Sequence, residues 1–198
     1  MIELHDVELL DDGRRLTDRP VTLQVRPGRF TAIVGSADVA KTELLRVIAG
    51  ERRPDAGSVA GAPAGGEAVW IPQGNHLSLA LTALENVAVP LIAAGIEGPT
   101  AAAHAQEVLE AVGLGESQGH LVEELSGGQQ QRVAIARGLA HLSAYLFADE
   151  PTTALDAGNR RKMLHLLAER AAHGVAVVVT TNDPDSLAGV ADDVLTLD

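Results

Sequence analysis

Short runs of apolar residues recur along the chain, and turn-forming residues separate them. In the first and last thirds these runs alternate with polar residues or stay continuously apolar, as in strands, whereas apolar residues in the middle third recur at helical spacing. The pattern predicts strands at residues 3–9, 21–25, 30–34, 68–71, 145–148, 175–180 and 194–197, helices at 41–49, 84–94, 101–112, 130–140 and 159–172, and a turn at 54–57. This order favours an α/β fold with a largely parallel core sheet and a helical insert.

Composition narrows the class of protein. A chain of 198 residues is expected to form one domain, and its core must be aliphatic because hydrophobic residues make up 46% of the chain and aromatic residues 2%. The formal net charge of -12 disfavours binding of nucleic acid through phosphate neutralisation, so no nucleic-acid partner is expected. The amino terminus lacks the features of a secretory signal, and no apolar run approaches the roughly 20 residues of a membrane span. We therefore expect a cytoplasmic protein.

A glycine-containing loop lies between the strand predicted at residues 30–34 and the helix predicted at residues 41–49. It reads Gly-Ser-Ala-Asp-Val-Ala-Lys-Thr, with the length and the Lys-Thr end of a phosphate-binding P-loop, although Ala40 occupies the place of the second glycine. Strand, loop and helix in this order direct backbone N–H groups toward an anion. Lys41 is one of only two lysines in the chain. The alternative for this segment alone is a turn that binds no phosphate.

Two further motifs follow in chain order. Residues 126–129, Ser-Gly-Gly-Gln, precede a predicted helix and offer a second anion-binding helix terminus, with the Ser126 hydroxyl as an additional donor. The strand predicted at residues 145–148 runs into Asp149 and Glu150. After a phosphate-binding loop, this arrangement is expected to place Asp149 beside a magnesium ion and Glu150 where it polarises an attacking water.

These motifs together resemble the ATP-binding domain of ABC transporters over nearly the whole chain. Residues 35–42 match Walker A, Gln73 resembles the Q-loop glutamine, residues 125–129 match the signature, residues 146–150 match Walker B, and Asp156 ends a D-loop-like segment. Residues 81–87 and 89–91 look like the subgroup that serves lipoprotein release and macrolide export. The resemblance implies a P-loop NTPase fold of ABC type, with a mainly parallel core sheet, an N-terminal antiparallel β part and a helical subdomain. It also implies a core subdomain of residues 1–72 and 144–198 and a helical subdomain of residues 73–143.

The resemblance also implies a role for each matching residue. The implied nucleotide-binding residues are Gly35, Ser36, Ala37, Asp38, Val39, Ala40, Lys41, Thr42 and Glu43, and the implied catalytic residues are Glu150, Asn182 and Gln73. Ser126, Gly127, Gly128 and Gln129 would contact the nucleotide of a partner subunit, Asp156 would belong to the dimer loop, and Thr42, Gln73 and Asp149 would hold Mg. The implied cofactors are ATP and Mg. The implied partners are a second ATP-binding subunit, in a homodimer or a heterodimer, and a membrane permease that holds the protein at the inner face of the cell membrane.

Several positions depart from the family pattern. The family has glycine in place of Asp38 and Ala40, a hydroxyl residue in place of Glu43, and a histidine in place of Asn182, which cannot carry a proton charge. A carboxylate about 5 Å from a phosphate charge is repelled by roughly 3 kcal/mol at an effective dielectric near 20. One hypothesis is that Asp38 or Glu43 turns onto the helix N-terminus in place of a phosphate.

The departures concern the Walker A side, whereas the signature at residues 126–129 is intact. We therefore hypothesise that the chain is the impaired half of a heterodimer and lends its signature to the partner's nucleotide. The family implies an ATPase, but Asp38, Ala40 and Asn182 weigh against unassisted hydrolysis. An alternative function is a non-catalytic regulatory or structural module that scarcely binds ATP. A soluble ABC protein of DNA repair or translation is a third hypothesis, which the acidic single domain disfavours.

Overall fold

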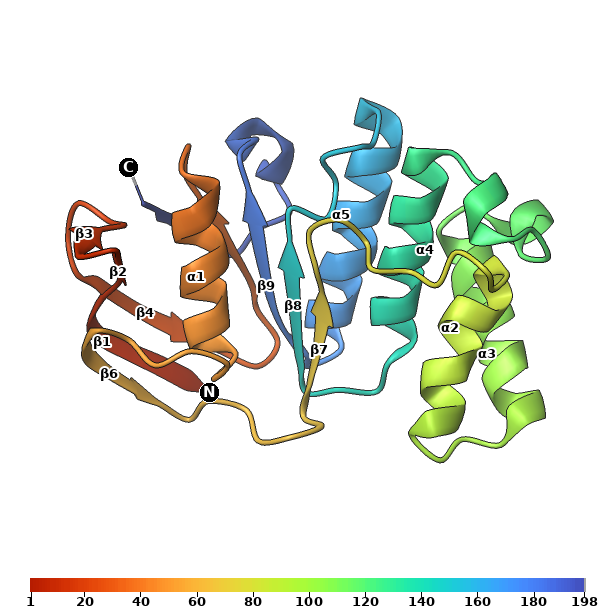
Figure 1. Cartoon of the computed structure of the whole chain (residues 1–198), viewed down its shortest axis with the longest axis horizontal. Helices are drawn as coiled ribbons and strands as arrows, with labels where there is room; N and C mark the ends of the chain where they lie inside the picture. Colours follow the sequence, from red (N-terminus) through yellow and green to blue (C-terminus); the bar gives the residue numbers. More distant parts are fainter. Residues whose placement is uncertain (198) are drawn as a thin grey trace.

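The apolar runs of the sequence become a parallel sheet that crosses the middle of the molecule (Figure 1). The computed structural model describes residues 1–197. The sheet contains, in spatial order, β10 (Asp193–Thr196), β5 (Phe30–Val34), β9 (Ala176–Thr181), β8 (Tyr145–Asp149) and β7 (Ala68–Ile71), all parallel to their neighbours. Every residue of β5 and β9 is buried, as expected where both faces of a parallel sheet are covered. The expected parallel core sheet is confirmed.

A smaller antiparallel sheet lies at the amino-terminal end of the fold and confirms the second expectation. It contains β4 (Val21–Val25), β1 (Ile2–Glu8) and β6 (Ala56–Ala60) in that order, and β2 (Leu10–Asp11) pairs separately with β3 (Arg14–Arg15). The turn predicted at residues 54–57 is wrong at its end, because β6 begins at Ala56. This strand is mostly exposed and shows no alternation of large apolar residues, so pairing with β1 defines it. At Gly57 a Cβ atom would lie 2.3 Å from the carbonyl oxygen of Asp6, so the pairing requires glycine.

Alternate residues of the central strands face two different layers. The helices that cover these faces are α1 (Asp38–Ile48) and α5 (Ala157–Ala172). Val178 packs in one apolar cluster with Leu44 of α1 and with the antiparallel sheet, whereas Val179 packs in a second cluster with Leu164 of α5. The sheet is therefore buried on both sides, and functional side chains can reach solvent only at its edges.

The helical insert lies between β7 and β8 and forms one end of the molecule (Figure 1). It contains α2 (Ala83–Ala93), α3 (Gly98–Ala111), the short 3-10 helices η1 (Gly115–Ser117) and η2 (Val122–Glu124), and α4 (Gly127–Ala140); a third 3-10 helix, η3 (Pro184–Leu187), follows β9. The apolar cluster around α5 continues into these helices without a break. Across residues 1–197, no helix is both long and apolar enough to cross a membrane.

Candidate functional site

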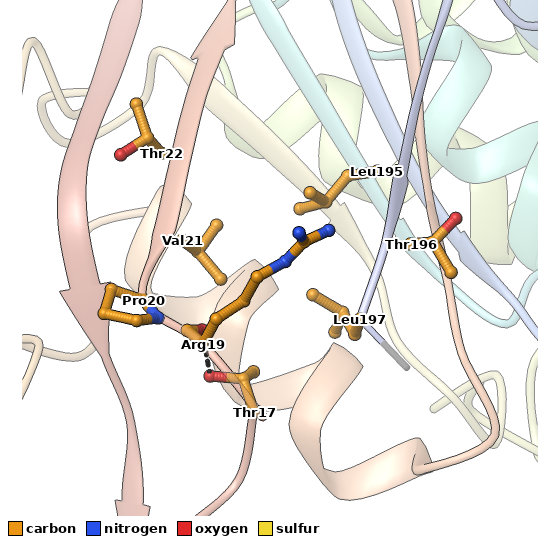
Figure 2. A pocket seen from close by; sticks show the side chains of 8 residues that line it. All are labelled: Thr17, Arg19, Pro20, Val21, Thr22, Leu195, Thr196 and Leu197. Atoms are coloured by element: carbon orange, nitrogen blue, oxygen red, sulfur yellow. Dashed lines mark hydrogen bonds between the residues drawn. The ribbon is translucent and has the colours of Figure 1, made fainter.

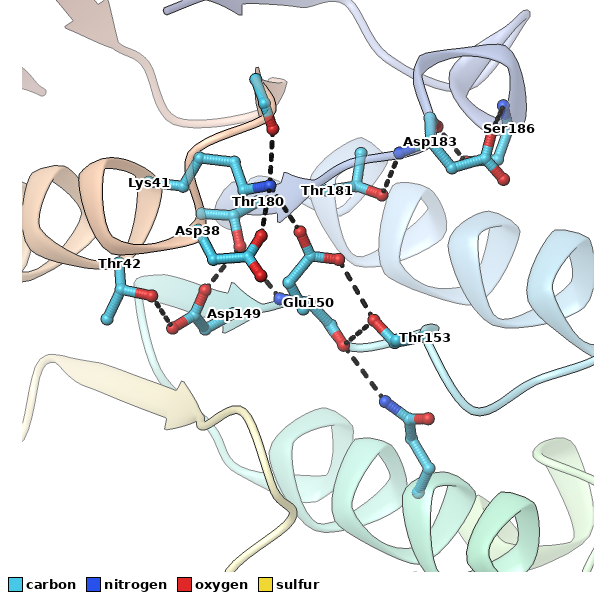
Figure 3. Close-up of polar contacts among 12 residues, drawn as sticks. Asp38, Lys41, Thr42, Asp149, Glu150, Thr153, Thr180, Thr181, Asp183 and Ser186 are labelled. Carbon is cyan, nitrogen blue, oxygen red and sulfur yellow. Dashed lines mark hydrogen bonds and ion pairs between the residues drawn. The ribbon is translucent and has the colours of Figure 1, made fainter. Parts of the chain in front are cut away.

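The carboxyl ends of β5, β8 and β9 meet at one edge of the parallel sheet. Val34 is paired with Thr181, and Asp149 is paired with Thr180. Residues that follow these strands are therefore neighbours in space although they are far apart in the sequence. Figure 3 shows the side chains that converge here from α1, β8 and β9.

Lys41 lies at the centre of this cluster and is fully buried. Its Nζ donates to the carbonyl oxygen of Gly35 at 2.7 Å, lies 2.8 Å from Glu150 Oε1 and lies 3.0 Å from Asp38 Oδ1. Burial lowers the pKa of Lys41, but hydrogen bonds and attraction from Glu150 and Asp38 outweigh it and hold the pKa above the ordinary value of 10.5. The lysine is therefore charged at neutral pH, with two hydrogen-bond acceptors, Gly35 O and Asp38 Oδ1, and a further ion pair to Glu150.

The P-loop segment is more helical than its sequence suggested. We expected the helix to begin near Lys41, but α1 begins at Asp38 with Ala37 as its N-cap. Neither Asp38 nor Ala40 has a positive φ, so neither residue carries the strain of a left-handed conformation. Side chains at these positions favour helix over the left-handed conformations that glycine permits. The first turn of α1 therefore includes residues 38–40, which the sequence assigned to the loop.

The hypothesis that a carboxylate turns onto the helix N-terminus is wrong in its geometry. Ala37 provides no side-chain cap, and Asp38 binds the Lys41 ammonium instead. Glu43 forms ion pairs with Arg46 at 3.0 Å and with Arg52, and both of these arginines lie outside the Lys41 cluster. Asp38 is thus the carboxylate that a phosphate would have to displace from Lys41.

Thr42 and Asp149 form the second part of the cluster. Thr42 donates its hydroxyl hydrogen to Asp149 Oδ2 at 2.7 Å, and Thr180 donates to Asp149 Oδ1 at 2.6 Å. Asp149 is nearly fully buried, so these two hydroxyls orient both of its oxygens. Sequence reasoning missed Thr180, although a polar residue at the end of an apolar strand was a visible signal.

Glu150 is held in a strained backbone conformation, with φ 46. Its N–H donates to Thr180 Oγ1 at 2.9 Å, and its carbonyl oxygen accepts from Gln131 Nε2 at 3.1 Å. Thr153 donates to Glu150 Oε2 at 3.1 Å, while Oε1 faces Lys41. Such strain persists only where the surroundings impose it, and it directs the carboxylate into the cluster. Gln131, which sequence reasoning also missed, is one of these restraints.

Two expected members lie outside the cluster. Gln73 and Asn182 are exposed, and neither side chain forms a hydrogen bond or ion pair within residues 1–197. Asn182 directly follows β9 and therefore lies at the same sheet edge. Gln73 follows β7, the outermost strand on that side. Neither residue is brought onto Lys41 or Asp149 in this conformation.

The signature residues lie at the start of α4. Ser126 is the N-cap, and its Oγ accepts from the backbone N–H of Gln129 at 3.3 Å and donates to Gln129 Oε1 at 2.9 Å. A Cβ atom at Gly127 would meet open space, whereas one at Gly128 would lie 3.3 Å from the carbonyl oxygen of Ala154. Gly127 is thus open to an outside ligand, and Gly128 is needed for packing.

Asp156 caps the next helix rather than lying in the cluster. Its Oδ1 accepts from the backbone N–H groups of Gly158 and Asn159, both at 3.0 Å. Hydrogen bonds from Asn159 hold the pKa of this carboxyl below its ordinary value of 3.8. Within one chain, Asp156 therefore has a structural role at the start of α5.

A pocket of about 270 Å³ lies beside the end of β10 (Figure 2). The Arg19 side chain extends across it toward Leu195 and Leu197. The backbone N–H of Leu197 donates to the carbonyl oxygen of Val34, the residue before Gly35, so this pocket adjoins the P-loop segment. Sequence reasoning did not find it because its walls come from opposite ends of the chain.

Comparison with known proteins identifies the family. The family described as ABC transporter matches residues 19–153. The chain belongs to the ABC transporter family. It is 37% identical over 180 residues to the lipoprotein-releasing system ATP-binding protein LolD of Saccharophagus degradans. The matched region covers 83% of this chain and 79% of LolD. It is 39% identical over 185 residues to the macrolide export ATP-binding/permease protein MacB 1/2 of Paracoccus denitrificans. This matched region covers 86% of this chain and 27% of MacB 1/2.

A solved structure of the same family supports the ABC fold over the full length. The ATP-binding cassette MJ0796, in a dimeric post-hydrolysis state bound to ADP and Pi, superposes with a TM-score of 0.85 at 30% identity, covering 100% of this chain and 94% of that one. The chain spans 27% and 31% of the ATP-binding/permease proteins MacB 1/2 and PvdT. The resemblance to the ATP-binding cassette of ABC transporters is therefore confirmed, and the chain is related to the cassettes of MacB, LolD and PvdT.

Proposed function

We propose that this chain is the ATP-binding subunit of an ABC transporter and couples nucleotide-driven dimer closure to a membrane permease. The convergence of Lys41, Thr42, Asp149 and Glu150 at the carboxyl edge of the sheet carries this proposal. A buried ammonium next to a helix N-terminus is suited to phosphate, and the neighbouring carboxylates are suited to a metal and a water. By this proposal the protein lies in the cytoplasm at the inner face of the membrane.

Thr42 and Asp149 provide a donor set that fits magnesium. Mg²⁺ prefers oxygen ligands and is usually bound by one or two carboxylates together with substrate phosphates. The Thr42 hydroxyl and Asp149 Oδ2 already lie side by side, and we propose that Gln73, which follows β7, would be a further ligand. When bound, the ion would neutralise charge on the phosphates. Glu150, whose Oε1 faces Lys41, would orient a water.

We further propose that the chain is the impaired half of a heterodimer. Lys41 already contacts Asp38, Glu150 and the Gly35 carbonyl, so a nucleotide phosphate must break internal contacts before it can bind. On the signature side Ser126 is exposed and Gly127 faces open space, and a partner's nucleotide would compete with a hydrogen bond between neutral groups, from Ser126 Oγ to Gln129 Oε1, instead of with ion pairs. These observations support a chain that offers its signature to a partner's nucleotide more readily than it binds its own.

Titration of the purified chain with ATP and Mg²⁺, followed by calorimetry, tests the ATP-binding role. Binding that disappears in Lys41→Ala supports the proposal, and absence of binding at millimolar ATP overturns it. Steady-state hydrolysis tests the impaired-half proposal separately. If the chain alone turns over at a typical enzyme rate of about 1–10³ s⁻¹ and Glu150→Gln abolishes that rate, the site is competent and this part of the proposal is refuted.

A non-catalytic ABC-fold module is the second candidate. The observation that favours it is that the buried ammonium of Lys41 already contacts three oxygen atoms of the chain, from Gly35, Asp38 and Glu150. Such a module would still pair with another ABC cassette through the surface that includes Ser126. It differs from the first candidate in showing no nucleotide binding even when co-purified with a membrane permease.

A further inference from the structure

Three consecutive residues directly after Gln73 have left-handed backbone conformations. The φ angles are 84 at Gly74, 66 at Asn75 and 47 at His76. Only glycine adopts this conformation without penalty, and runs of L-residues in it are rare. The turn has weak local support, since the His76 N–H donates to the Gly74 carbonyl at 2.8 Å and the Asn75 N–H to the Pro72 carbonyl at 3.4 Å. A restraint from elsewhere in the fold is therefore required.

Arg137 of α4 supplies that restraint. Its Nη2 donates to the carbonyl oxygen of Asn75 and its Nη1 donates to the carbonyl oxygen of His76, both at 2.8 Å. The planar guanidinium thus spans two successive carbonyl groups, and both hydrogen bonds come from a charged donor. Burial lowers the pKa of Arg137, but an arginine keeps its charge at neutral pH. The contact pins the two non-glycine residues of the left-handed turn.

The next residue of α4 explains how Arg137 reaches the turn. A Cβ atom at Gly138 would lie 2.5 Å from Cγ1 and Cδ1 of Ile71, so only glycine lets α4 approach the end of β7 this closely. Glycine is otherwise unfavourable inside a helix. Ile71 lies two residues before Gln73 along the chain. Gly138 and Arg137 together fix α4 against both the strand and the turn that flank Gln73.

The same helix restrains a second strained residue in the site. Gln131 donates to the carbonyl oxygen of Glu150, which also has a positive φ. Side chains of α4 therefore hold left-handed backbone at both loops, through carbonyl oxygens in each case. The Arg137 contact and the Gln131 contact thus have the same effect: each lets α4 restrain the backbone of a loop at the site.

We propose that Arg137 is a positioning residue for Gln73. It holds the turn at residues 74–76 in its left-handed form and thereby sets the direction in which Gln73 leaves the end of β7. The importance of this direction rests on the proposed function, in which Gln73 acts at the nucleotide and its magnesium ion. Arg137 contacts the turn backbone and has no contact with Lys41, Asp149 or Glu150 among the described residues.

Trp70 provides a spectroscopic measurement close to the turn. It is the only tryptophan, lies three residues before Gln73, and packs against Phe147 with ring centroids 6.2 Å apart. We expect Arg137→Met to shift Trp70 fluorescence and to accelerate amide hydrogen exchange of residues 73–78 by about tenfold, the effect of losing hydrogen bonds to a charged donor. Arg137→Lys keeps a charged donor and should restore part of the protection.

Arg132→Met is the matched control. Arg132 lies on the same helix and also donates to two backbone carbonyls, but these belong to Val112 and Gly113 at the end of α3. It should leave Trp70 emission and amide exchange at residues 73–78 unchanged. Equal changes in the Arg132 and Arg137 variants would overturn the proposal, because the effect would then reflect general loosening of α4.

Glycine substitution in the turn separates positioning from simple packing. In an Asn75→Gly/His76→Gly background the left-handed turn needs no restraint, so Arg137→Met should have a much smaller effect on exchange and fluorescence. An undiminished effect would refute the role assigned to Arg137. This comparison uses differences between folded variants and does not depend on nucleotide binding.

Mg²⁺ dependence of ADP binding connects the turn to the site. Arg137→Met should raise the Mg²⁺ concentration needed for half-maximal strengthening of ADP binding and leave the Mg²⁺-free affinity unchanged, and an unchanged Mg²⁺ dependence would overturn the effect on Gln73. If the wild-type chain binds no nucleotide, the proposed function fails. Exchange and fluorescence then still decide whether Arg137 holds the turn.

Discussion

Replacement of Asp38 by Asn should strengthen nucleotide binding. Asp38 Oδ1 lies 3.0 Å from Lys41 Nζ, and a nucleotide phosphate would compete for the same ammonium group. Asn has nearly the shape of Asp but no charge, so it weakens this competition without opening a cavity. Asp38→Gly should increase affinity further, because glycine also destabilises the first turn of α1 by about 1 kcal/mol and frees the loop.

The size of the effect follows from the exposure of the two groups. A hydrogen bond to a charged group contributes about 1.5–3 kcal/mol, but exposed ion pairs contribute only about 0–1 kcal/mol. Lys41 is 0% exposed while the Asp38 side chain is 54% exposed, so solvent screens one partner strongly. We expect about 1 kcal/mol for Asp38→Asn, which corresponds to roughly a fivefold lower Kd. The gain should shrink as salt increases.

Calorimetric titration with ADP and Mg²⁺ at two salt concentrations measures this gain. Glu43→Gln is the matched control, because Glu43 is also a carboxylate of α1 but forms ion pairs with Arg46 and Arg52 instead of Lys41. It should leave the Kd nearly unchanged. If Asp38→Asn has no effect, or if Glu43→Gln produces the same gain, competition at Lys41 is not what limits binding.

Three other changes test the packing and capping of the fold. Thr180→Val removes the hydroxyl that donates to Asp149 and should lower the free energy of unfolding by about 1–3 kcal/mol, as measured by urea denaturation; no loss would mean that this bond contributes nothing net. Gly138→Ala should cost about 1–3 kcal/mol because its Cβ would overlap Ile71, and Ile71→Ala should relieve that cost in the double variant; an additive double variant would contradict the overlap. The pKa of Asp156 is lowered in the folded state, so its contribution to stability is present above its ordinary pKa of 3.8 and is lost as the pH falls through the lower folded value. Asp156→Asn should therefore flatten the acid end of the urea-midpoint profile, and an identical profile would argue against this linkage.

The strands and helices were largely predictable from the pattern of apolar residues. The apolar run from Val175 to Val179 predicts a buried strand, and all of it except Val175 lies in β9. The apolar residues of α4 recur at helical spacing. The predicted ends of strands and helices were wrong where the local sequence preference and the tertiary pairing favour different structures. Ala56–Ala60 has little strand propensity and becomes β6 only because β1 lies beside it, and the helix start at Asp38 depends on side chains that favour helix within a short connection.

The motifs in the sequence were sufficient to predict that Lys41, Thr42, Asp149 and Glu150 lie together. Each lies at or just after the end of a strand, or at the start of the helix that follows one, and these positions meet at one edge of a parallel sheet. Only the tertiary structure showed that Asp38 and Glu150 both contact Lys41, that Glu43 instead forms ion pairs with Arg46 and Arg52, and that Gln73 and Asn182 make no contact with the cluster.

The roles of Thr180, Gln131 and Arg137 were likewise decided by the fold, since each acts on a backbone or side-chain group at least 30, 19 and 61 positions away. The sequence shows which chemical groups the chain can bring to a site. Which of them are in contact depends on strand register and on the close approach of α4 to β7, which are set by packing over the whole molecule.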